Sequence, residues 1–234
     1  MANLIKFEDC TKIENLPFEE YLKIDCTSFS TIKSIRNGMQ RDFKVTDKVT
    51  RGKIVDEIQT GNPLLYQHHP MFEECNAISK EIDNFLGKIK PLLKSQNSYT
   101  GTLSYDGMTL KIKGRTDFEI GKKILIDLKV TEDAKNIDDC LKLVSFMGYD
   151  KQLFNYAGLS SACNPLSKLG LQEQRDSVFI FMYSRKAKKV FPVQLFKTEE
   201  EIRKAESWWI DKVLEFGTCE SDFFSGEDDN SGLF

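Results

Sequence analysis

Two neighbouring segments, GRTD at Gly114–Asp117 and ILIDLK at Ile124–Lys129, each carry an acidic and a basic residue, and the second also has the alternation of a strand. Gly121-Lys122 between them is a turn signal. The flanking stretches, Met108–Ile120 and Lys123–Val130, are therefore predicted to be antiparallel strands joined by this tight turn. Across such a turn, residues whose numbers sum to about 244 face one another.

This register brings Asp117 next to Asp127, and alternation puts Asp127 and Lys129 on the same face of their strand. Two neighbouring carboxylates repel unless a cation lies between them. Mg²⁺ suits such a position because it prefers oxygen ligands, and the backbone carbonyl of Leu128 is another oxygen at the same edge. Lys129 would then reach a metal-bound water or the developing charge on a phosphate. The pattern is typical of a phosphodiester hydrolysis site, although a lone D-x-K triplet is also common in exposed strands.

A helix predicted over Asp150–Ser161 adds polar side chains to this region. Tyr149, Gln152 and Tyr156 fall at i, i+3 and i+7, on one helical face. A glutamine and a tyrosine four residues apart can present an amide and a hydroxyl to a phosphate. Ordinary packing against the core is the alternative interpretation, and the spacing alone does not separate the two.

Apolar periodicity, caps and turn residues predict the other elements. Helices are expected from Ser28 or Ser30 to Phe43, over Arg51–Gln59 after a Thr50 cap, over Asn76–Ser95, over Ile137–Phe146, and from a Thr198 cap to Phe216. Strands are expected over Tyr99–Tyr105, Ser177–Ser184 and Lys189–Phe196, with Asp106-Gly107 as a hairpin turn. The N-terminal third reads as helical. The order predicts an α/β fold with a mixed central sheet flanked by helices, in one domain over residues 1–216.

The composition is that of an ordinary soluble protein: 234 residues, 40% hydrophobic and 29% charged. No apolar run is long enough to cross a bilayer, and the first residues do not resemble a secretory signal, so a cytoplasmic location without a membrane partner is expected. The six cysteines form no CxxC pair, which argues against zinc ribbons and thioredoxin-like motifs.

Charge is unevenly distributed along the chain. Thr31–Lys53 has seven basic and two acidic residues, a net +5, whereas Gly217–Phe234 has five acidic residues and no basic one. A mildly basic body of this kind can bind nucleic acid. Residues 217–234 are expected to be a disordered acidic tail. Docking onto a protein partner or folding back on the basic segment are the alternatives.

Together these segments resemble the PD-(D/E)xK nuclease superfamily. GRTD, IDLKVT and YDKQLFNY are similar to the motifs of its RecB-type branch, which carries a Q-x-x-x-Y helix after D-x-K. The wider resemblance, over roughly Glu19 to Leu159, is to the RecE-like exonucleases (exodeoxyribonuclease VIII) of phage recombination systems. It includes EEYLKIDCTSFSTIK from Glu19, RGKIVDEI from Arg51 and DLKVTEDA from Asp127.

The resemblance implies a restriction-endonuclease-like core and a role for each matching residue. Asp117, Asp127 and the Leu128 carbonyl would hold Mg²⁺, with Mn²⁺ as the other candidate ion. Lys129 would be the catalytic lysine, and Gln152 and Tyr156 would lie beside the scissile phosphate. Asp56 stands where relatives have a histidine, four residues after a glycine, and is the candidate for a further metal ligand.

The function implied is that of a Mg²⁺-dependent DNA exonuclease acting on duplex ends in phage-type or bacterial recombination. A homo-oligomer in the bacterial or phage-infected cytoplasm is expected, and a single-strand annealing or replication partner would bind the acidic tail. A structure-selective endonuclease of the same fold and a non-cleaving DNA-end binding module are the alternatives. No iron–sulfur cluster is expected, because Cys163 and Cys219 stand alone downstream.

Overall fold

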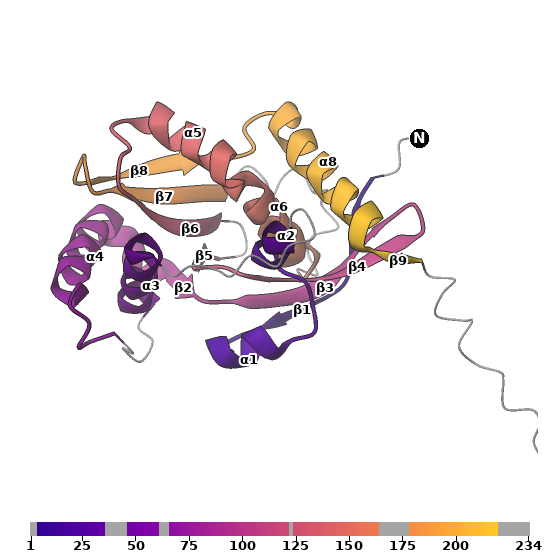
Figure 1. The fold of residues 1–234 in the computed structure, drawn as a ribbon, viewed down its shortest axis with the longest axis horizontal. Coiled ribbons are helices and arrows are strands. Elements are labelled where there is room, and N and C mark those ends of the chain that lie inside the picture. Colours follow the sequence, from indigo (N-terminus) through magenta and orange to yellow (C-terminus); the bar gives the residue numbers. More distant parts are fainter. Residues whose placement is uncertain (1–3, 36–45, 61–65, 122–123, 164–177, 220–234) are drawn as a thin grey trace, which may run out of the picture.

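The computed structural model describes residues 4–35, 46–60, 66–121, 124–163 and 178–219, and two sheets form its centre (Figure 1). A hairpin organises the first of them. β3 (Ser98–Tyr105) and β4 (Met108–Arg115) pair antiparallel around Asp106-Gly107. Both turn residues have positive φ, 51° and 76°, as a type I′ turn requires. The predicted hairpin is confirmed.

The first sheet has four strands in the order β1-β3-β4-β9, and every neighbouring pair is antiparallel. β1 (Lys6–Ile13) forms one edge, and β9 (Thr218–Cys219) forms the other. β1 corrects the expectation of a helical N-terminal third. Its own alternation is weak, and its strand conformation depends on pairing with β3, which lies about 90 residues later in the chain.

The second sheet is mixed and has five strands in the order β2-β5-β6-β7-β8. The strands are β2 (Leu93–Ser95), β5 (Phe118–Ile120), β6 (Ile124–Thr131), β7 (Val178–Ser184) and β8 (Lys189–Gln194). β6 and β7 are parallel, whereas the other pairs are antiparallel. The predicted α/β fold with a mixed central sheet flanked by helices is confirmed.

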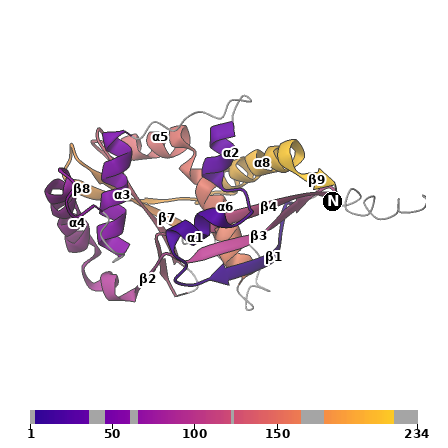
Figure 2. The same cartoon turned by 60° about the horizontal axis from the view of Figure 1, so that its bottom comes forward.

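Helices pack against both sheets (Figure 1). They are α1 (Phe18–Lys23), α2 (Phe29–Ile35), α3 (Asp47–Thr60), α4 (Phe72–Leu86), α5 (Ile137–Met147), α6 (Tyr149–Ala162) and α8 (Glu199–Phe216), with a 3₁₀ helix, η1 (Gly87–Leu92). One buried core lies between α3, α4 and the sheet, and a larger one lies between the sheets, α5, α6 and α8. Both views place α3 and α4 at one end and α8 with β9 at the other (Figure 1, Figure 2).

The strand predicted over Met108–Ile120 is wrong in one important respect, because it is broken. β4 belongs to the first sheet and β5 to the second, with Thr116 and Asp117 between them. At the break, the Thr116 N–H donates to Asn97 O and the Gln96 N–H donates to Asp117 O, both at 3.0 Å. The chain thus leaves the first sheet after Arg115 and enters the second at Phe118, so the candidate site residue Asp117 lies in the connection directly before β5.

Several helix boundaries also differ from the prediction. The helix predicted over Asn76–Ser95 begins at Phe72 and ends at Leu86, because Gly87 has φ +46° and the chain continues as η1 and β2. The helix expected after Thr50 begins at Asp47. The structure describes α2 as far as Ile35. The rest of the helix predicted to Phe43 falls in 36–45, outside the described residues.

Of the two candidate caps Ser28 and Ser30, Ser28 caps α2, and the predicted Thr198 cap is confirmed; their hydroxyls accept from the N–H groups of Thr31 (3.2 Å) and Glu201 (3.3 Å). The cap predicted at Thr50 is wrong, because this residue lies inside α3. Thr218–Cys219, expected in the tail, form β9 instead, and residues 220–234 lie outside the described residues. No helix within the described ranges is long and apolar enough to cross a membrane.

Candidate active site

The site begins at the antiparallel pairing of β5 with β6. Phe118 faces Ile126, so the predicted sum of 244 is confirmed, and Asp117 directly precedes this pair. Asp117 Oδ2 accepts a hydrogen bond from the Leu128 N–H at 2.7 Å. Asp127 lies inside β6 and is 1% exposed. Local strand geometry therefore brings the two carboxylates together, as the sequence predicted.

Lys129 lies on the same face of β6 as Asp127 and forms an ion pair with its Oδ2 atom. Its Nζ also lies 3.4 Å from Leu128 O and 5.2 Å from the centre of the Tyr149 ring. Burial by itself lowers the pKa of Lys129, but the Asp127 and Asp117 carboxylates outweigh it and raise the pKa above its usual range. Lys129 therefore stays a cation at physiological pH.

Burial is the largest influence on Asp117 as well, and it raises the pKa of this carboxyl well above its usual range. The negative charges of Asp127 and Asp56 act in the same direction, whereas Lys129 and the Leu128 N–H oppose them. The carboxyl groups thus repel one another, and a cation placed among them would relieve that repulsion.

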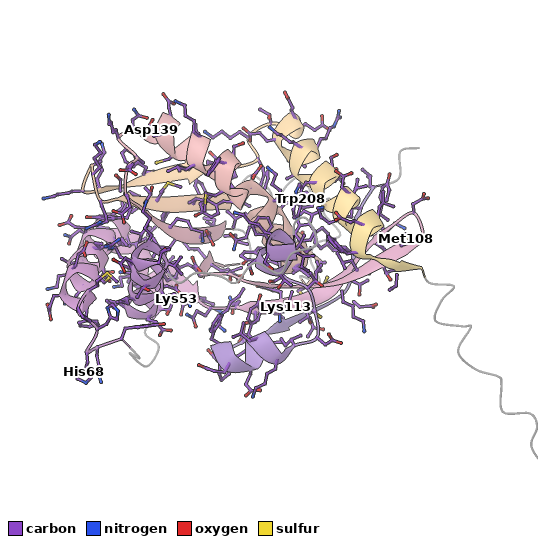
Figure 3. All side chains as sticks on the ribbon, in the orientation of Figure 1. Lys53, His68, Met108, Lys113, Asp139 and Trp208 are labelled. Carbon is purple, nitrogen blue, oxygen red and sulfur yellow. The ribbon has the colours of Figure 1, made fainter. Side chains whose placement is uncertain are left out.

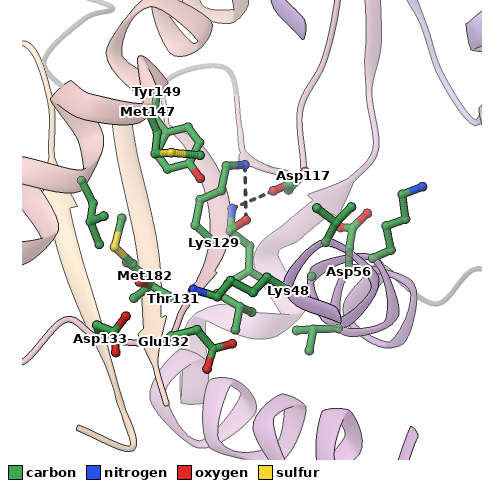
Figure 4. A pocket seen from close by; sticks show the side chains of 17 residues that line it. Lys48, Asp56, Asp117, Lys129, Thr131, Glu132, Asp133, Met147, Tyr149 and Met182 are labelled. Atoms are coloured by element: carbon green, nitrogen blue, oxygen red, sulfur yellow. Dashed lines mark hydrogen bonds between the residues drawn. The ribbon is translucent and has the colours of Figure 1, made fainter. Parts of the chain in front are cut away.

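Asp117, Leu128 and Lys129 border a cavity of about 480 Å³ between α3, β6 and the α5–α6 junction, whereas the buried Asp127 is not among the residues that line it. Figure 4 shows Lys129 and Asp117 pointing into it, with Tyr149 and Met147 on one side and α3 on the other. Lys48 extends from α3 across the cavity toward Thr131 (Figure 4). Carboxylates, lysines and apolar side chains line this cavity, and together they can hold a phosphate and the nucleoside attached to it.

Asp56 reaches this pocket from α3, far from the strands in sequence. Burial raises the pKa of Asp56 to about 6, and Glu57 and Asp127 add to the effect, while Lys129 and Arg115 oppose it. Its Oδ1 atom is buried and has no hydrogen-bond partner among the described residues. A buried oxygen without a partner is costly, so its presence at this cavity favours a ligand role.

A set of ion pairs fixes α3 at this position. Arg51 of α3 contacts Glu132 at 2.5 Å and Glu74 of α4 at 3.4 Å. Arg185, which follows β7, pairs with the same two glutamates. The four side chains join α3 and α4 to the ends of β6 and β7, and Asp56 is held over the site as a consequence.

Gln152 and Tyr156 are bonded to each other, with the Gln152 amide donating to the Tyr156 hydroxyl at 2.7 Å. Tyr156 is 8% exposed, and neither residue lines the cavity. Burial raises the pKa of Tyr156, and the charge of Asp127 adds to it, so the ring lies within electrostatic reach of the carboxylates. The structure thus places Gln152 and Tyr156 outside the lining of the cavity. Tyr149, on the same face of the helix, does line it.

Gly114 of the GRTD segment explains how closely α6 approaches β4. A Cβ atom at this position would lie 2.5 Å from Cδ1 of Tyr156. Gly114→Ala is expected to lower the free energy of unfolding by about 1–3 kcal/mol in urea titrations, because the ring must shift. Gly52→Ala is the control, since no atom lies within 4 Å there and alanine favours the helix by up to about 1 kcal/mol. Equal stability of the two variants would contradict the close contact.

Two functional candidates were not singled out by sequence reasoning. Lys48 lines the cavity, and Arg115 lies close enough to Asp56 and Asp117 for their charges to counteract the lowering of its pKa by burial. Arg115 is held by Leu16 O at 3.0 Å and lies over the Phe18 and Tyr21 rings. The feature of the sequence that could have indicated Arg115 is its position in GRTD, two residues before Asp117.

The residues fit a hard divalent cation. Across the described part of the chain, no three His, Cys, Asp or Glu side chains converge on one point. The donor set is instead two carboxylates, Asp117 and Asp127, and the Leu128 carbonyl, all of them oxygen ligands of the kind Mg²⁺ prefers. The Lys129 ammonium contacts two of these three groups, which shows that a positive charge is accommodated among them. The Asp56 Oδ1 atom, which has no hydrogen-bond partner among the described residues, is a further candidate metal ligand at the same cavity.

The raised pKa of Asp56 predicts how the stability of the metal-free protein depends on pH. Because its folded-state pKa of about 6 exceeds the ordinary value of 3.8, ionisation destabilises the folded protein as pH rises through this interval. With EDTA present, Asp56→Asn should be roughly 2–3 kcal/mol more stable than wild type at pH 7–8 and equal at pH 3–4. Urea unfolding across this pH range measures it, with exposed Asp25→Asn as the control. Parallel pH profiles for wild type and Asp56→Asn would contradict the prediction.

His68 and His69 do not line the cavity, and the His69 ring nitrogen accepts from the Met71 N–H at 3.2 Å. Figure 3 shows His68 at the α4 end of the molecule.

The fold is an α/β architecture shared with a protein described as a nuclease. The chain is similar to the crystal structure of a "putative exonuclease" from Eubacterium rectale, with a TM-score of 0.52 and 14% sequence identity. The match covers 83% of this chain and 80% of that one. At this identity the likeness bears on the fold. No protein-family model matches the sequence, and no curated protein matches it.

Proposed function

We propose that this protein is a Mg²⁺-dependent deoxyribonuclease of the RecB-type branch of the PD-(D/E)xK superfamily, closest to the RecE-like exonucleases. It would hydrolyse phosphodiester bonds from duplex DNA ends. The observation that carries the proposal is the β5–β6 register, which sets Asp117 beside Asp127 and directs Lys129 into an open cavity. Tyr149 and Lys48 at the same cavity support a substrate with both phosphate and apolar parts.

The chain's own residues would divide the work as follows. Asp117, Asp127 and the Leu128 carbonyl hold the ion, and Asp56 is the candidate for a further ligand. A bound Mg²⁺ polarises the phosphoryl oxygens and lowers the pKa of a water molecule at the site. Lys129, kept protonated by the Asp127 carboxylate, donates hydrogen bonds to the phosphate oxygens as their charge increases in the transition state.

The pair formed by Gln152 and Tyr156 would position rather than react. Its hydrogen bond and the packing of Tyr156 on Gly114 hold α6 against β4, and α6 in turn presents Tyr149 to Lys129. The Lys129 ammonium over the Tyr149 ring is thereby restricted in direction, so that its hydrogen bonds point into the cavity.

The biological setting follows from the same proposal. Duplex DNA ends are the substrate, a homo-oligomer is the working form, and recombination in a bacterial or phage-infected cell is the process. The acidic residues 220–234, which lie outside the described residues, would bind a single-strand annealing or replication partner.

The test is incubation of the full chain with end-labelled linear duplex and with closed circular duplex, in Mg²⁺, Mn²⁺ or EDTA. Degradation of the linear DNA alone, abolished by EDTA, is expected. Nicking of the circle would support the endonuclease alternative. Binding of linear DNA without cleavage in either metal would support a DNA-end binding module and overturn the proposed activity.

A further inference from the structure

A second cavity, of about 490 Å³, lies beside the active site and plays no part in the function proposed above. It is a groove between α2, the α5–α6 junction and α8. Met147 lines both this groove and the active-site cavity, so the two meet at the turn between α5 and α6. A chain that leaves the active site over Met147 enters the groove.

Aromatic rings line this groove. Phe146, one residue before Met147, is 84% exposed, more than the other exposed large hydrophobic residues of the described chain. Trp208 of α8 faces Phe29 of α2 with ring centres 5.5 Å apart, and Figure 3 places Trp208 between these two helices. Its neighbour Trp209 is fully buried and donates to Lys151 O, which is the packing role expected of a helical tryptophan. The exposed Phe146 and the half-buried Trp208 and Phe216 are thus rings that a ligand can reach in the groove.

Lysines alternate with these rings. Lys33, Lys151 and Lys212 line the groove, together with two acidic residues, Asp211 and Glu215. The Lys212 ammonium lies 5.8 Å from the centre of the Trp208 ring. Lys212 pairs with Glu215, and Lys151 pairs with Asp150 at 2.8 Å. Because pairs at the surface are weak, a phosphate can replace the exposed Glu215 as the partner of Lys212. The Lys151–Asp150 pair is largely buried, so Lys151 would contact a phosphate while it keeps Asp150 as its partner.

We propose that this groove binds single-stranded DNA next to the active site, which rests on the nuclease function proposed above. Bases stack on Phe146 and Trp208, and the phosphates between them contact Lys212, Lys151 and Lys33. Aromatic rings interleaved with cations are how proteins hold single strands without reading their sequence. Phe146 lines the groove next to Met147, which lines both cavities, and a duplex end must open here if one strand is to enter the active site and the other is to pass along the groove.

The test measures binding of fluorescein-labelled oligo(dT) to the full chain by anisotropy, in EDTA so that no cleavage occurs. Phe146→Ala and Trp208→Ala should each weaken binding roughly 5- to 100-fold, the usual range for one stacked base. Lys212→Ala should weaken it and also reduce its salt dependence. The matched controls on α8 are Leu214→Ala, which is 50% exposed, and Lys204→Ala, since neither residue lines the groove.

Tryptophan fluorescence gives a second readout. Trp209 is buried, so oligo(dT) should quench chiefly Trp208, and Trp208→Phe should abolish the quenching while preserving the fold. Wild-type affinity in both aromatic variants, or equal losses in the controls, would overturn the groove proposal even if the protein cleaves DNA. Groove-dependent binding by a protein that never cleaves would instead support the groove and overturn the nuclease activity.

Discussion

Lys129→Ala is expected to lower the rate of DNA cleavage by about a thousandfold or more while leaving DNA binding largely intact. Its ammonium is the cation directed into the active-site cavity by the strand that carries Asp127. Loss of one group that stabilises charge in a transition state commonly costs about 3–4 kcal/mol of barrier, and each ~1.4 kcal/mol is a factor of ten. Single-turnover rates on a labelled duplex at saturating Mg²⁺ measure the effect.

Two further variants make this result specific. Asp127→Asn should be equally inactive, because it removes a metal ligand and the partner of Lys129 at once. Lys111→Ala, on the exposed side of β4, is the control and should cleave at the wild-type rate. Circular dichroism must show that each variant is folded. Cleavage by folded Lys129→Ala within a few-fold of wild type would mean that the active site lies elsewhere.

The second large effect concerns Glu119, a buried carboxylate of β5 that the sequence analysis did not select. It accepts hydrogen bonds from Tyr99 (2.6 Å), Asn97 (2.7 Å) and Thr116 (3.0 Å), and it is 5% exposed. Glu119→Ala would leave the buried Tyr99 and Asn97 donors without this acceptor, and Thr116 with only the longer bond to Asn97 O, so we expect a loss of about 3–5 kcal/mol in the free energy of unfolding. Urea titration measures this loss.

Because Thr116 adjoins Asp117, the same change should disturb the metal site. The Mg²⁺ concentration that gives half-maximal thermal stabilisation should rise in Glu119→Gln, which retains the size of the side chain and is better suited to this measurement. Glu8→Ala is the control, because this exposed carboxylate accepts from Ser104 at 2.5 Å far from the site and should cost under about 0.5 kcal/mol. A Glu119→Ala protein as stable as Glu8→Ala would show that the buried network contributes little.

Reasoning from sequence succeeded where the responsible interactions are local. The β5–β6 register followed from a short turn and a period of two, which brought Asp117 and Asp127 together before any tertiary contact was known. Ser28 and Thr198 were identified as caps because a hydroxyl reaches an N–H only three residues away. The helical face of Tyr149, Gln152 and Tyr156 was likewise a property of one helix.

It was less successful where a segment depends on distant partners. β1 forms because β3 offers hydrogen bonds to it, and the strand predicted over Met108–Ile120 divides where Asn97 and Tyr99 both donate hydrogen bonds to Glu119. The division matters for the site, since it places Asp117 in the connection directly before β5 and not in the middle of a continuous strand. No local pattern in the strand itself indicates this.

The sequence by itself determined the residue types of the candidate site and the pairing of two carboxylates with a lysine, because one turn and strand alternation are enough to place them. Only the tertiary structure decided which other groups share their cavity. Asp56 reaches the cavity because the ion pairs of Arg51 hold α3 at this position. Tyr149 faces Lys129, whereas Gln152 and Tyr156 do not, because α6 packs closely on Gly114. These positions depend on how helices pack against a sheet, and packing is a property of surfaces that meet only when the whole chain has folded.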